Sequence, residues 1–376
     1  MLTAYFPFSA VAGNRNSFFV PESGNLLGIG YNTDGQLGVG DRSTQTKLSS
    51  IRIPNCEYVA PGYSHTIFLD QDGGCWSTGS NRCGALGLDI AGYTQNPILI
   101  EGIPQMKYIS SGCDHSLFLD AEGSVWGCGL NKSGQLGTGD HKTSHNQLTK
   151  IDNIPEIEYI SCGYDHSLLL DRQGGVWSFG SNAFGQLGFR TNDATVKIPT
   201  QIENIPRMNL VASGCHSLFL DKQGSVWACG GNELGELGLG DRNQRDVPEQ
   251  IKSIPTSVQF IACGSEHSMF LDNEQNVWGC GSNMSGELGL GHASRTLSPA
   301  KLPKLDNIQF ISCGSQHSLF VSGDGKVSYC GSDSLHYYIK KNEAKNQMYH
   351  FPAKLKVPKV RTTVLSTQNV KSARAV

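Results

Sequence analysis

A segment similar to Gly-x-x-His-Ser recurs at an almost constant interval, and this interval constrains the fold more than any other feature of the chain. Its histidines are separated by 50, 51, 50, 51 and 50 residues, and they are His65, His115, His166, His216, His267 and His317. A looser copy at Gly13–Val20 places Asn16 where the histidine would stand. Seven units of about 50 residues predict a repeat architecture, in which each unit packs against its neighbours.

Each unit contains short strand-like runs separated by turns. In the third unit, Ser116–Leu119 and Val125–Cys128 flank the turn Asp120–Gly123, where glycine supplies the positive φ of a hairpin. A proline-containing segment such as Pro97–Ile100 fits an outer strand, because proline is tolerated at sheet edges. With the apolar run before the Gly-x-x-His segment, each unit has four strands. We therefore predict an all-β fold, a seven-bladed β-propeller with four-stranded blades.

Residues that recur in one slot are expected to pack rather than to react. The five tryptophans share a slot, and packing between neighbouring blades is favoured over ligand contact for Trp76, Trp126, Trp177, Trp227 and Trp278. Most of the 12 cysteines also recur in repeat slots, which favours small buried apolar residues over disulfides or metal ligands. The histidines stand on separate blades without a converging carboxylate or cysteine set, so we expect no metal site.

Motifs for bond-making chemistry are missing from the sequence. The chain has no G-x-x-x-x-G-K-[ST] loop, no H-E-x-x-H and no paired C-x-x-C, so we expect no cofactor. We find no apolar run of about 18 residues and no secretory signal in residues 1–10. The sequence therefore predicts an intracellular protein, cytoplasmic or nuclear, without a transmembrane segment.

The order of residues within a unit resembles the repeat of the regulator of chromosome condensation family. It reads G-x-x-H-S-L-F-L-D-x-x-G-x-V-W-x-x-G-x-N-x-x-G-Q-L-G-x-G-D, and it covers roughly Gly13 to Gly331. Its most specific piece, N-x-x-G-[QE]-L-G, occurs at Asn32–Gly38, Asn131–Gly137, Asn182–Gly188, Asn232–Gly238 and Asn283–Gly289, with Ala85 in the copy at Asn81–Gly87. The resemblance implies a seven-bladed propeller. The founding activity of the family is guanine-nucleotide exchange on the small GTPase Ran, and other members are interaction modules attached to ubiquitin ligases, GTPase regulators or light sensors.

The resemblance also implies a site, because the founding exchange factor presents acidic residues from Gly-x-x-His loops of neighbouring blades. The matching acids here, expected to promote exchange, are Asp114, Asp165 and Glu266. A carboxylate there would compete for the lysine or magnesium that holds the nucleotide phosphates. Other residues of these loops are expected to contact the partner, namely Tyr63, Cys113, Tyr164 and Gln316. The alternative that the acids merely cap their loops stays open.

The leading hypothesis is a monomeric propeller that binds a small GTPase, as an exchange factor for Ran or a relative. The alternative is a non-catalytic scaffold associated with chromatin or a ubiquitin ligase. The even spacing leaves no room for the inserted β-wedge through which the founding factor contacts its GTPase, so another route to the partner is required. Nothing in the chain resembles the tryptophan-rich loops of the plant ultraviolet photoreceptor.

The C-terminal tail is basic, and the rest of the chain is acidic. From Lys340 to Val376, nine Lys or Arg residues oppose one acid, so the tail carries +8 and the remainder −11 of a net −3. The tail is a candidate site for a polyanion, although ordinary solvation explains its charge equally well. We assign residues 1–359 to the propeller. Because Thr363–Ser366 resembles an inner strand and the inner strand around Phe8–Ala12 is weak, residues 360–376 are expected to help complete the first blade.

Overall fold

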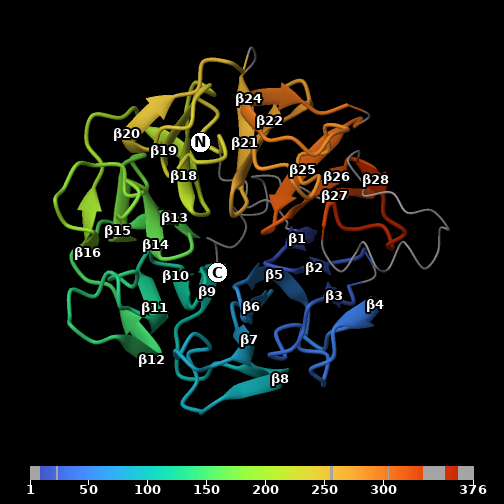
Figure 1. The fold of residues 1–376 in the computed structure, drawn as a ribbon. Helices are drawn as coiled ribbons and strands as arrows, with labels where there is room; N and C mark the ends of the chain where they lie inside the picture. The colour runs from blue at the N-terminus through green and yellow to red at the C-terminus, as the bar shows by residue number, and fades with distance from the viewer. Residues whose placement is uncertain (1–8, 23, 255–256, 304, 333–351, 363–376) are drawn as a thin grey trace, which may run out of the picture.

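Seven antiparallel sheets stand in a ring around a central channel, as the computed structural model shows (Figure 1). The structure describes residues 9–22, 24–254, 257–303, 305–332 and 352–362. Every sheet has four strands, and no helix occurs within the described ranges. The prediction of an all-β, seven-bladed propeller with four-stranded blades is confirmed.

Each blade runs from an inner strand at the channel to an outer strand at the rim. The first blade contains β1 (Ala10–Ala12), β2 (Asn16–Phe19), β3 (Leu27–Gly30) and β4 (Gln45–Ser50), and the second contains β5 (Cys56–Pro61), β6 (His65–Asp70), β7 (Cys75–Ser80) and β8 (Tyr93–Leu99). The third contains β9 (Met106–Ser111), β10 (His115–Asp120), β11 (Val125–Leu130) and β12 (Ser144–Lys150), the fourth β13 (Ile157–Cys162), β14 (His166–Asp171), β15 (Val176–Ser181) and β16 (Thr195–Gln201), and the fifth β17 (Met208–Ser213), β18 (His216–Asp221), β19 (Val226–Gly230) and β20 (Arg245–Gln250). The sixth contains β21 (Val258–Cys263), β22 (His267–Asp272), β23 (Val277–Gly281) and β24 (Thr296–Lys301), and the seventh β25 (Ile308–Cys313), β26 (His317–Ser322), β27 (Val327–Gly331) and β28 (Ala353–Lys354).

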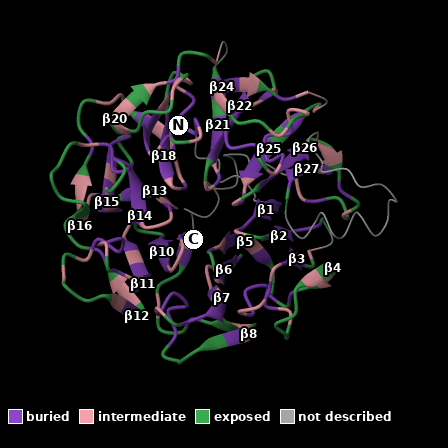
Figure 2. Cartoon of the chain, viewed as in Figure 1, coloured by how far each residue is buried: buried purple, intermediate pink, exposed green. Residues whose placement is uncertain are grey.

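The core lies between adjacent blades. All six residues of β10 are buried, whereas the residues of the outer strand β12 are mostly half-buried or exposed (Figure 2). Ile67 of the second blade and Phe118 and Cys128 of the third belong to one apolar cluster, so each blade supplies half of the core on either side of it. All 12 cysteines are free, and those of the V-W-x-C-G slot are buried, as expected of apolar packing residues.

The ring has two distinct faces. One face, which we call the loop face, carries the Gly-x-x-His loops and the Asn-x-x-Gly loops, since His115 pairs with Gly129 where β10 begins and β11 ends. The opposite face, the turn face, carries hairpins such as Asp120–Gly123. Because every blade has the same strand order, equivalent loops of different blades open on the same face.

The tryptophans are half-buried rather than fully buried. Trp126 packs against the apolar cluster shared by the second and third blades, as predicted. Its indole Nε1 also donates a hydrogen bond to Asp120 Oδ2 at 3.0 Å, and the other four tryptophans donate to the matching turn aspartates over 2.8 to 3.2 Å. The aspartate and the tryptophan are missing together from the seventh blade, where Ser322 and Ser328 take their places.

Residues from both ends of the chain meet at the first blade. Its inner strand is Ala10–Ala12, and Val360 forms an isolated antiparallel bridge with Pro21 in the same sheet region. The Val360 N–H also donates to the Gly325 carbonyl of the seventh blade at 3.0 Å. The expected inner-strand segment Thr363–Ser366, like most of the basic tail, lies outside the described residues. The described part of the C-terminal segment therefore contacts both blades that adjoin the closure.

Candidate functional site

The repeated histidines link each blade to the next through a buried hydrogen bond. In six consecutive contacts, the Nε2 of a histidine lies 2.6 to 3.0 Å from a serine Oγ of the following blade, in the pairs His65–Ser116, His115–Ser167, His166–Ser217, His216–Ser268, His267–Ser318 and His317–Ser17. The last of these pairs joins the seventh blade to the first. These histidines hold the loop face together.

The hydrogen-bond pattern fixes the protonation state of these histidines. Ser217 Oγ donates to the Gln186 carbonyl at 2.7 Å, so it accepts from the Nε2–H of His166. The Nδ1 of His166 is buried without a hydrogen-bond partner in the described structure. Burial lowers the pKa of His166 to about 3, with a smaller contribution from the charge of His216. These imidazoles are therefore neutral structural groups at neutral pH.

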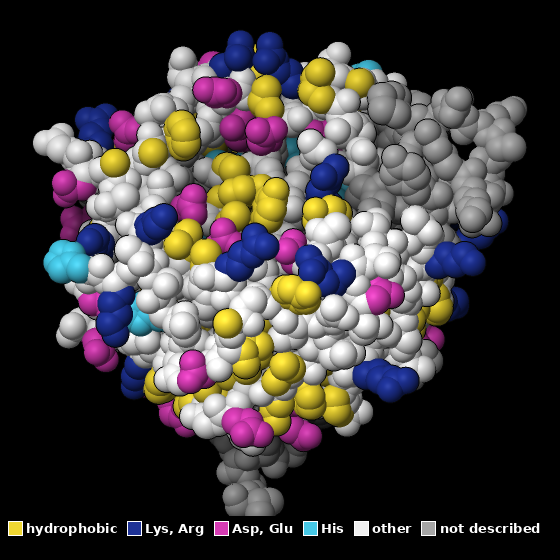
Figure 3. Space-filling view, turned by 60° about the horizontal axis from the view of Figure 1, so that its bottom comes forward, with side chains coloured by type: hydrophobic (Ala, Val, Ile, Leu, Met, Phe, Trp, Pro, Cys, Tyr) yellow, Lys and Arg dark blue, Asp and Glu magenta, His cyan; other side chains and the backbone are white. Residues whose placement is uncertain are grey.

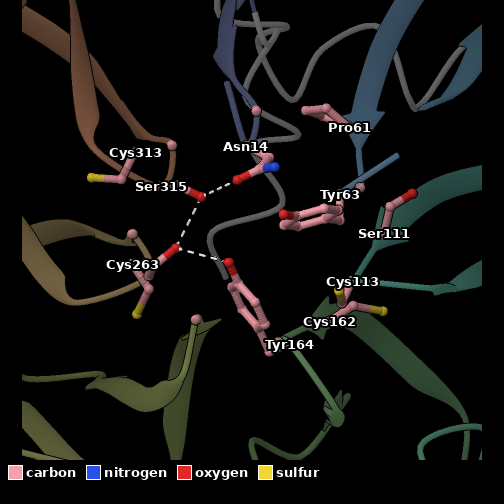
Figure 4. A pocket seen from close by; sticks show the side chains of 18 of the residues that line it. Asn14, Pro61, Tyr63, Ser111, Cys113, Cys162, Tyr164, Cys263, Cys313 and Ser315 are labelled. Carbon is pink, nitrogen blue, oxygen red and sulfur yellow. Dashed lines mark hydrogen bonds between the residues drawn. The ribbon is translucent and has the colours of Figure 1, made fainter. Parts of the chain in front are cut away.

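The Gly-x-x-His loops surround the mouth of the central channel. A cavity of about 130 Å³ opens there, lined by residues from all seven blades. Figure 4 shows Tyr63 and Tyr164 beside a row of polar side chains. Ser265 Oγ lies 3.4 Å from Tyr164 Oη and 3.0 Å from Ser315 Oγ, and the Ser315 hydroxyl donates to Asn14 Oδ1. The channel mouth is thus an aromatic and polar basin on the loop face.

Two of the predicted acids, Asp114 and Asp165, lie on adjacent loops. The Cys113 N–H donates to the Tyr164 carbonyl at 3.2 Å, which ties the two loops together. Both carboxylates are half-buried, and burial raises the pKa of each. The charge of Asp114 raises the pKa of Asp165 further. The two acids therefore form an electrostatically coupled pair.

The pair has only weak internal partners. Cys113 Sγ lies 3.7 Å from Asp114 Oδ2, and Gln135 Nε2 donates to Asp165 Oδ1 at 3.4 Å. In the described part of the chain, no salt bridge involves either acid. Their negative charge is available to a cation from outside the chain.

The remaining predicted residues lie on the same face. Glu266 and Gln316 are exposed on the loops of the sixth and seventh blades, and the Tyr63 side chain is 47% exposed. Cys113 is half-buried, and burial together with the charges of Asp114 and Asp165 raises its pKa to about 12, so its thiol is a weak nucleophile. No group of three or more potential metal-ligating side chains occurs among the described residues.

Sequence reasoning missed a set of residues in the fifth blade. Its loop reads Gly214-Cys215-His216, one residue shorter than the others, and it lacks the acidic position. Glu236 takes the slot that glutamine holds in the first, third and fourth blades, and Gly231 precedes Asn232 where Ser181 and Ser282 stand in the fourth and sixth. The departures were visible once the repeats were aligned on their histidines.

Known protein families share the repeat that builds these blades. A profile of the RCC1-like domain matches residues 148–373, and a profile of the regulator of chromosome condensation (RCC1) repeat matches residues 72–119 and 122–170. The chain belongs to the RCC1-like domain family. Within the described residues of this family member, no helix is long and apolar enough to cross a membrane.

Relatives of this RCC1-like domain include much larger proteins. The chain is 32% identical over 292 residues to the probable E3 ubiquitin-protein ligase HERC4 of Homo sapiens, which covers 74% of this chain and 28% of the relative. The human ligase HERC3 is 36% identical over 253 residues, covering 66% and 24%. The chain thus spans about a quarter of the length of these ligases.

Solved structures share the fold. Prp20p from Saccharomyces cerevisiae superposes with a TM-score of 0.78 at 20% identity, covering 93% of this chain and 88% of Prp20p. Human WBSCR16 superposes with a TM-score of 0.75 at 24% identity, covering 85% and 87%. At these identities the likeness shows the propeller fold alone.

Proposed function

We propose that the loop face binds a small GTPase, Ran or a relative, and accelerates release of its nucleotide. The observation that carries this proposal is the coupled pair Asp114 and Asp165, which is half-buried on adjacent loops of the loop face and has no salt bridge in the described structure. Membership of the RCC1-like domain family and the structural likeness to Prp20p, which binds Gsp1p, support it.

The proposed mechanism is competition rather than bond-making. In a nucleotide-bound GTPase, lysine and magnesium neutralise the phosphates. A carboxylate pair that reaches this region competes with the phosphates for the lysine or the magnesium, so it interacts more favourably with the GTPase when the nucleotide is absent. Because a ligand shifts an equilibrium toward the state that it binds better, the pair stabilises the nucleotide-free GTPase. Glu266, on the sixth blade, adds negative charge on the same face.

The test is release of labelled GDP from a panel of small GTPases, including Ran, at catalytic concentrations of the full chain. We expect Asp114→Asn and Asp165→Asn each to reduce the exchange rate by about tenfold, the cost of about 1.4 kcal/mol in the transition state. Glu122→Gln is the matched control, because Glu122 is exposed on the turn face of the blade that carries Asp114. Its exchange rate is expected to equal that of the unmodified protein.

Thermal unfolding of the same variants separates a site role from a structural one. Half-exposed acids without salt bridges contribute little to folding, so the melting temperature of Asp165→Asn should stay close to that of the unmodified protein. If Asp165→Asn unfolds the protein, the carboxylate caps its loop and the proposed site role is withdrawn. If no GTPase in the panel responds to the unmodified protein, the exchange proposal is wrong.

A second candidate function is a non-catalytic scaffold. The similarity to HERC4 and HERC3, in which an RCC1-like region occupies about a quarter of a ubiquitin ligase, favours recruitment of a partner. Prp20p binds histones as well as Gsp1p, and a basic partner of this kind would suit the acidic residues Asp114, Asp165 and Glu266 of the loop face. A scaffold binds its partner at stoichiometric concentration without changing GDP release, which distinguishes it from an exchange factor.

Polyanion binding by the basic tail stays a prediction. Figure 3 shows basic and acidic side chains interspersed on the described surface of one face, without a continuous basic area. If the tail binds a polyanion, replacing Lys371 and Arg374 with glutamine should weaken retention on heparin, and this change leaves the described strand β28 intact.

A further inference from the structure

One of the seven junctions between blades lacks the histidine–serine bond that the other six have. It is the junction of the first and second blades, where Asn16 takes the place of the histidine and Thr66 takes the place of the serine. Asn16 Nδ2 donates to the Tyr31 carbonyl of its own blade at 3.5 Å, and Asn16 Oδ1 is buried without a hydrogen-bond partner in the described structure. Thr66 Oγ1 donates to the Gln36 carbonyl at 2.7 Å, as the serines do in their blades, but within the described residues no side-chain donor of the first blade reaches it.

Backbone links on the channel side are missing from the same junction. Four loops donate a backbone hydrogen bond to the loop of the next blade, in the pairs Tyr63–Cys113, Cys113–Tyr164, Tyr164–Gly214 and Ser315–Asn14. In the described part of the chain, the Asn14 N–H makes no such bond to the second blade. The loops of the fifth and sixth blades also lack it, but their junctions keep the histidine–serine bond.

The inner strand of the second blade cannot replace these links. It ends at Pro61, which has no N–H, whereas the equivalent Cys162 and Ala12 donate a backbone hydrogen bond to a serine Oγ of the preceding blade at 2.9 and 3.0 Å. A Cβ on Gly13 would lie 2.8 Å from Pro61 Cβ, so the two blades touch at this point. Figure 4 shows Asn14 beside Pro61 and Tyr63 at this junction. On the channel side of the loop face, these two blades therefore meet through van der Waals contact.

The outer part of this junction is well bonded. Thr78 Oγ1 of the second blade donates to the Gly35 carbonyl of the first at 3.0 Å. Farther out, the Gly40 N–H donates to the Gln95 carbonyl at 2.9 Å, and the Arg42 guanidinium lies 4.0 Å from the centre of the Tyr93 ring. The missing bonds are thus confined to the channel side, and the outer loops are placed to act as a hinge.

Chain connectivity alone would put the weak point elsewhere. The two ends of the chain meet at the junction of the seventh and first blades, which non-covalent contacts must close. There, His317 Nε2 lies 3.0 Å from Ser17 Oγ, the Ala12 N–H donates to Ser312 Oγ, and the Ser315 hydroxyl donates to Asn14 Oδ1. The closing junction has the links that the following junction lacks.

We infer that the propeller opens locally between the first and second blades, on the channel side of the loop face, before it opens there at any other junction. The free energy of a local opening depends on the contacts that it breaks, so the junction without interblade hydrogen bonds opens most often. Asn14 and Tyr63 both line the cavity at the channel mouth, so this opening widens the mouth between them. The inference goes beyond the proposed function, because it concerns the free protein and needs no partner.

The test is amide hydrogen–deuterium exchange of the full chain without a partner, followed by mass spectrometry of its peptides. Segments 10–18 and 58–66 flank the junction, and segments 159–168 and 210–218 flank the equivalent junction of the fourth and fifth blades. After correction for intrinsic rates, we expect deuterium uptake about tenfold faster in the first pair, because one buried hydrogen bond changes an opening equilibrium by about this factor. Equal protection of the two pairs overturns the inference.

Restoring the missing bond assigns the opening to this junction. Asn16→His combined with Thr66→Ser supplies the pair that the other junctions have, so uptake in both flanking segments should slow by about tenfold. Thr66→Ser alone is the matched control, because its hydroxyl keeps the bond to the Gln36 carbonyl without a new link between blades. This single variant should not slow uptake. A double variant that folds but does not slow uptake contradicts the inference.

The converse substitution keeps the test decisive if the restored variant does not fold. His166→Asn combined with Ser217→Thr gives the junction of the fourth and fifth blades the residues of the first. Uptake in segments 159–168 and 210–218 should rise by about tenfold, while segments 10–18 and 58–66 stay as they are. Unchanged uptake at the altered junction overturns the inference. Release of GDP is measured separately, so failure of the nucleotide-exchange proposal leaves the deuterium pattern expected here unchanged.

Discussion

Replacing one of the interblade histidines should make the protein less sensitive to acid. The change that we choose is His166→Asn, because Asn16 occupies the same slot in the first blade. His166 is buried, neutral and bonded to Ser217 Oγ at 2.9 Å, and burial lowers its pKa to about 3. In the unfolded chain a histidine has a pKa of about 6.5.

The sign of the effect follows from proton linkage. Between about pH 6.5 and pH 3, the unfolded chain binds a proton at His166 that the folded protein does not bind, so the stability of the folded state falls as the pH falls through this window. At about pH 5 the loss amounts to about 2 kcal/mol per histidine relative to pH 7. Burial also lowers the pKa of His65, His115, His216 and His267 to about 3 or 4, so their contributions add to this loss.

The assay is urea unfolding, followed by tryptophan fluorescence, at about pH 7 and at about pH 5. At pH 7, His166→Asn should cost about 1 to 3 kcal/mol, because Ser217 loses its buried donor. At pH 5 this cost should shrink by about 2 kcal/mol, since the variant no longer has the linked proton. His141→Asn is the control for the substitution itself, because His141 is exposed. An equal cost of His166→Asn at both pH values would refute the assignment of His166 as a buried neutral group.

Two further predictions concern packing and ring closure. Trp126→Ala should lower the free energy of unfolding by about 3 kcal/mol, because it removes a half-buried indole and its hydrogen bond to Asp120. Trp126→Phe should lower it by about 1 kcal/mol, because it removes mainly the hydrogen bond. If urea unfolding gives a loss below about 1 kcal/mol for Trp126→Ala, the residue is available for ligand contact instead. Deletion of residues 360–376 should lower the melting temperature and promote aggregation, because it removes the bridge between Val360 and Pro21 and exposes a strand edge and apolar surface. Unchanged melting temperature and solubility would show that this segment does not help to close the ring.

The fold could be predicted from the sequence because the repeat fixes it many times over. The equal spacing of the histidine segments predicted the number of blades, and a turn between two apolar runs, such as Asp120–Gly123, predicted the hairpin within each blade. The depth of burial was harder to predict. Trp126 packs between blades as expected, but it is half-buried rather than fully buried, and its Nε1 donates to the buried turn residue Asp120.

The long-range partners of the repeated residues could not be predicted from one unit. The His-Ser dipeptide recurs in five of the six units that carry the histidine, with His65-Thr66 in the sixth case, yet each histidine bonds to the serine of the next unit, about 50 residues away. Only the ring geometry places His65 against Ser116. The pairing of Asp114 with Asp165 depends on the same geometry, since the loops are brought together by a backbone bond between Cys113 and Tyr164.

Because the blades repeat so regularly, a residue that differs from its equivalents in the other blades is easy to recognise. The fifth blade departs at neighbouring points of one face: its loop lacks the acidic position, Gly231 replaces the serine of the adjoining blades, and Glu236 replaces glutamine. Cys215 lies among the resulting charges, and after burial the charges of Glu266, Glu236 and Asp165 raise its pKa to about 12. A glutamate with a serine donor, as in the sixth blade, is satisfied within the chain. Glutamate combined with glycine lacks that serine donor, and burial together with the charges of Glu266 and Glu233 raises the pKa of Glu236, so its carboxyl group takes up a proton at a higher pH than an exposed glutamate does.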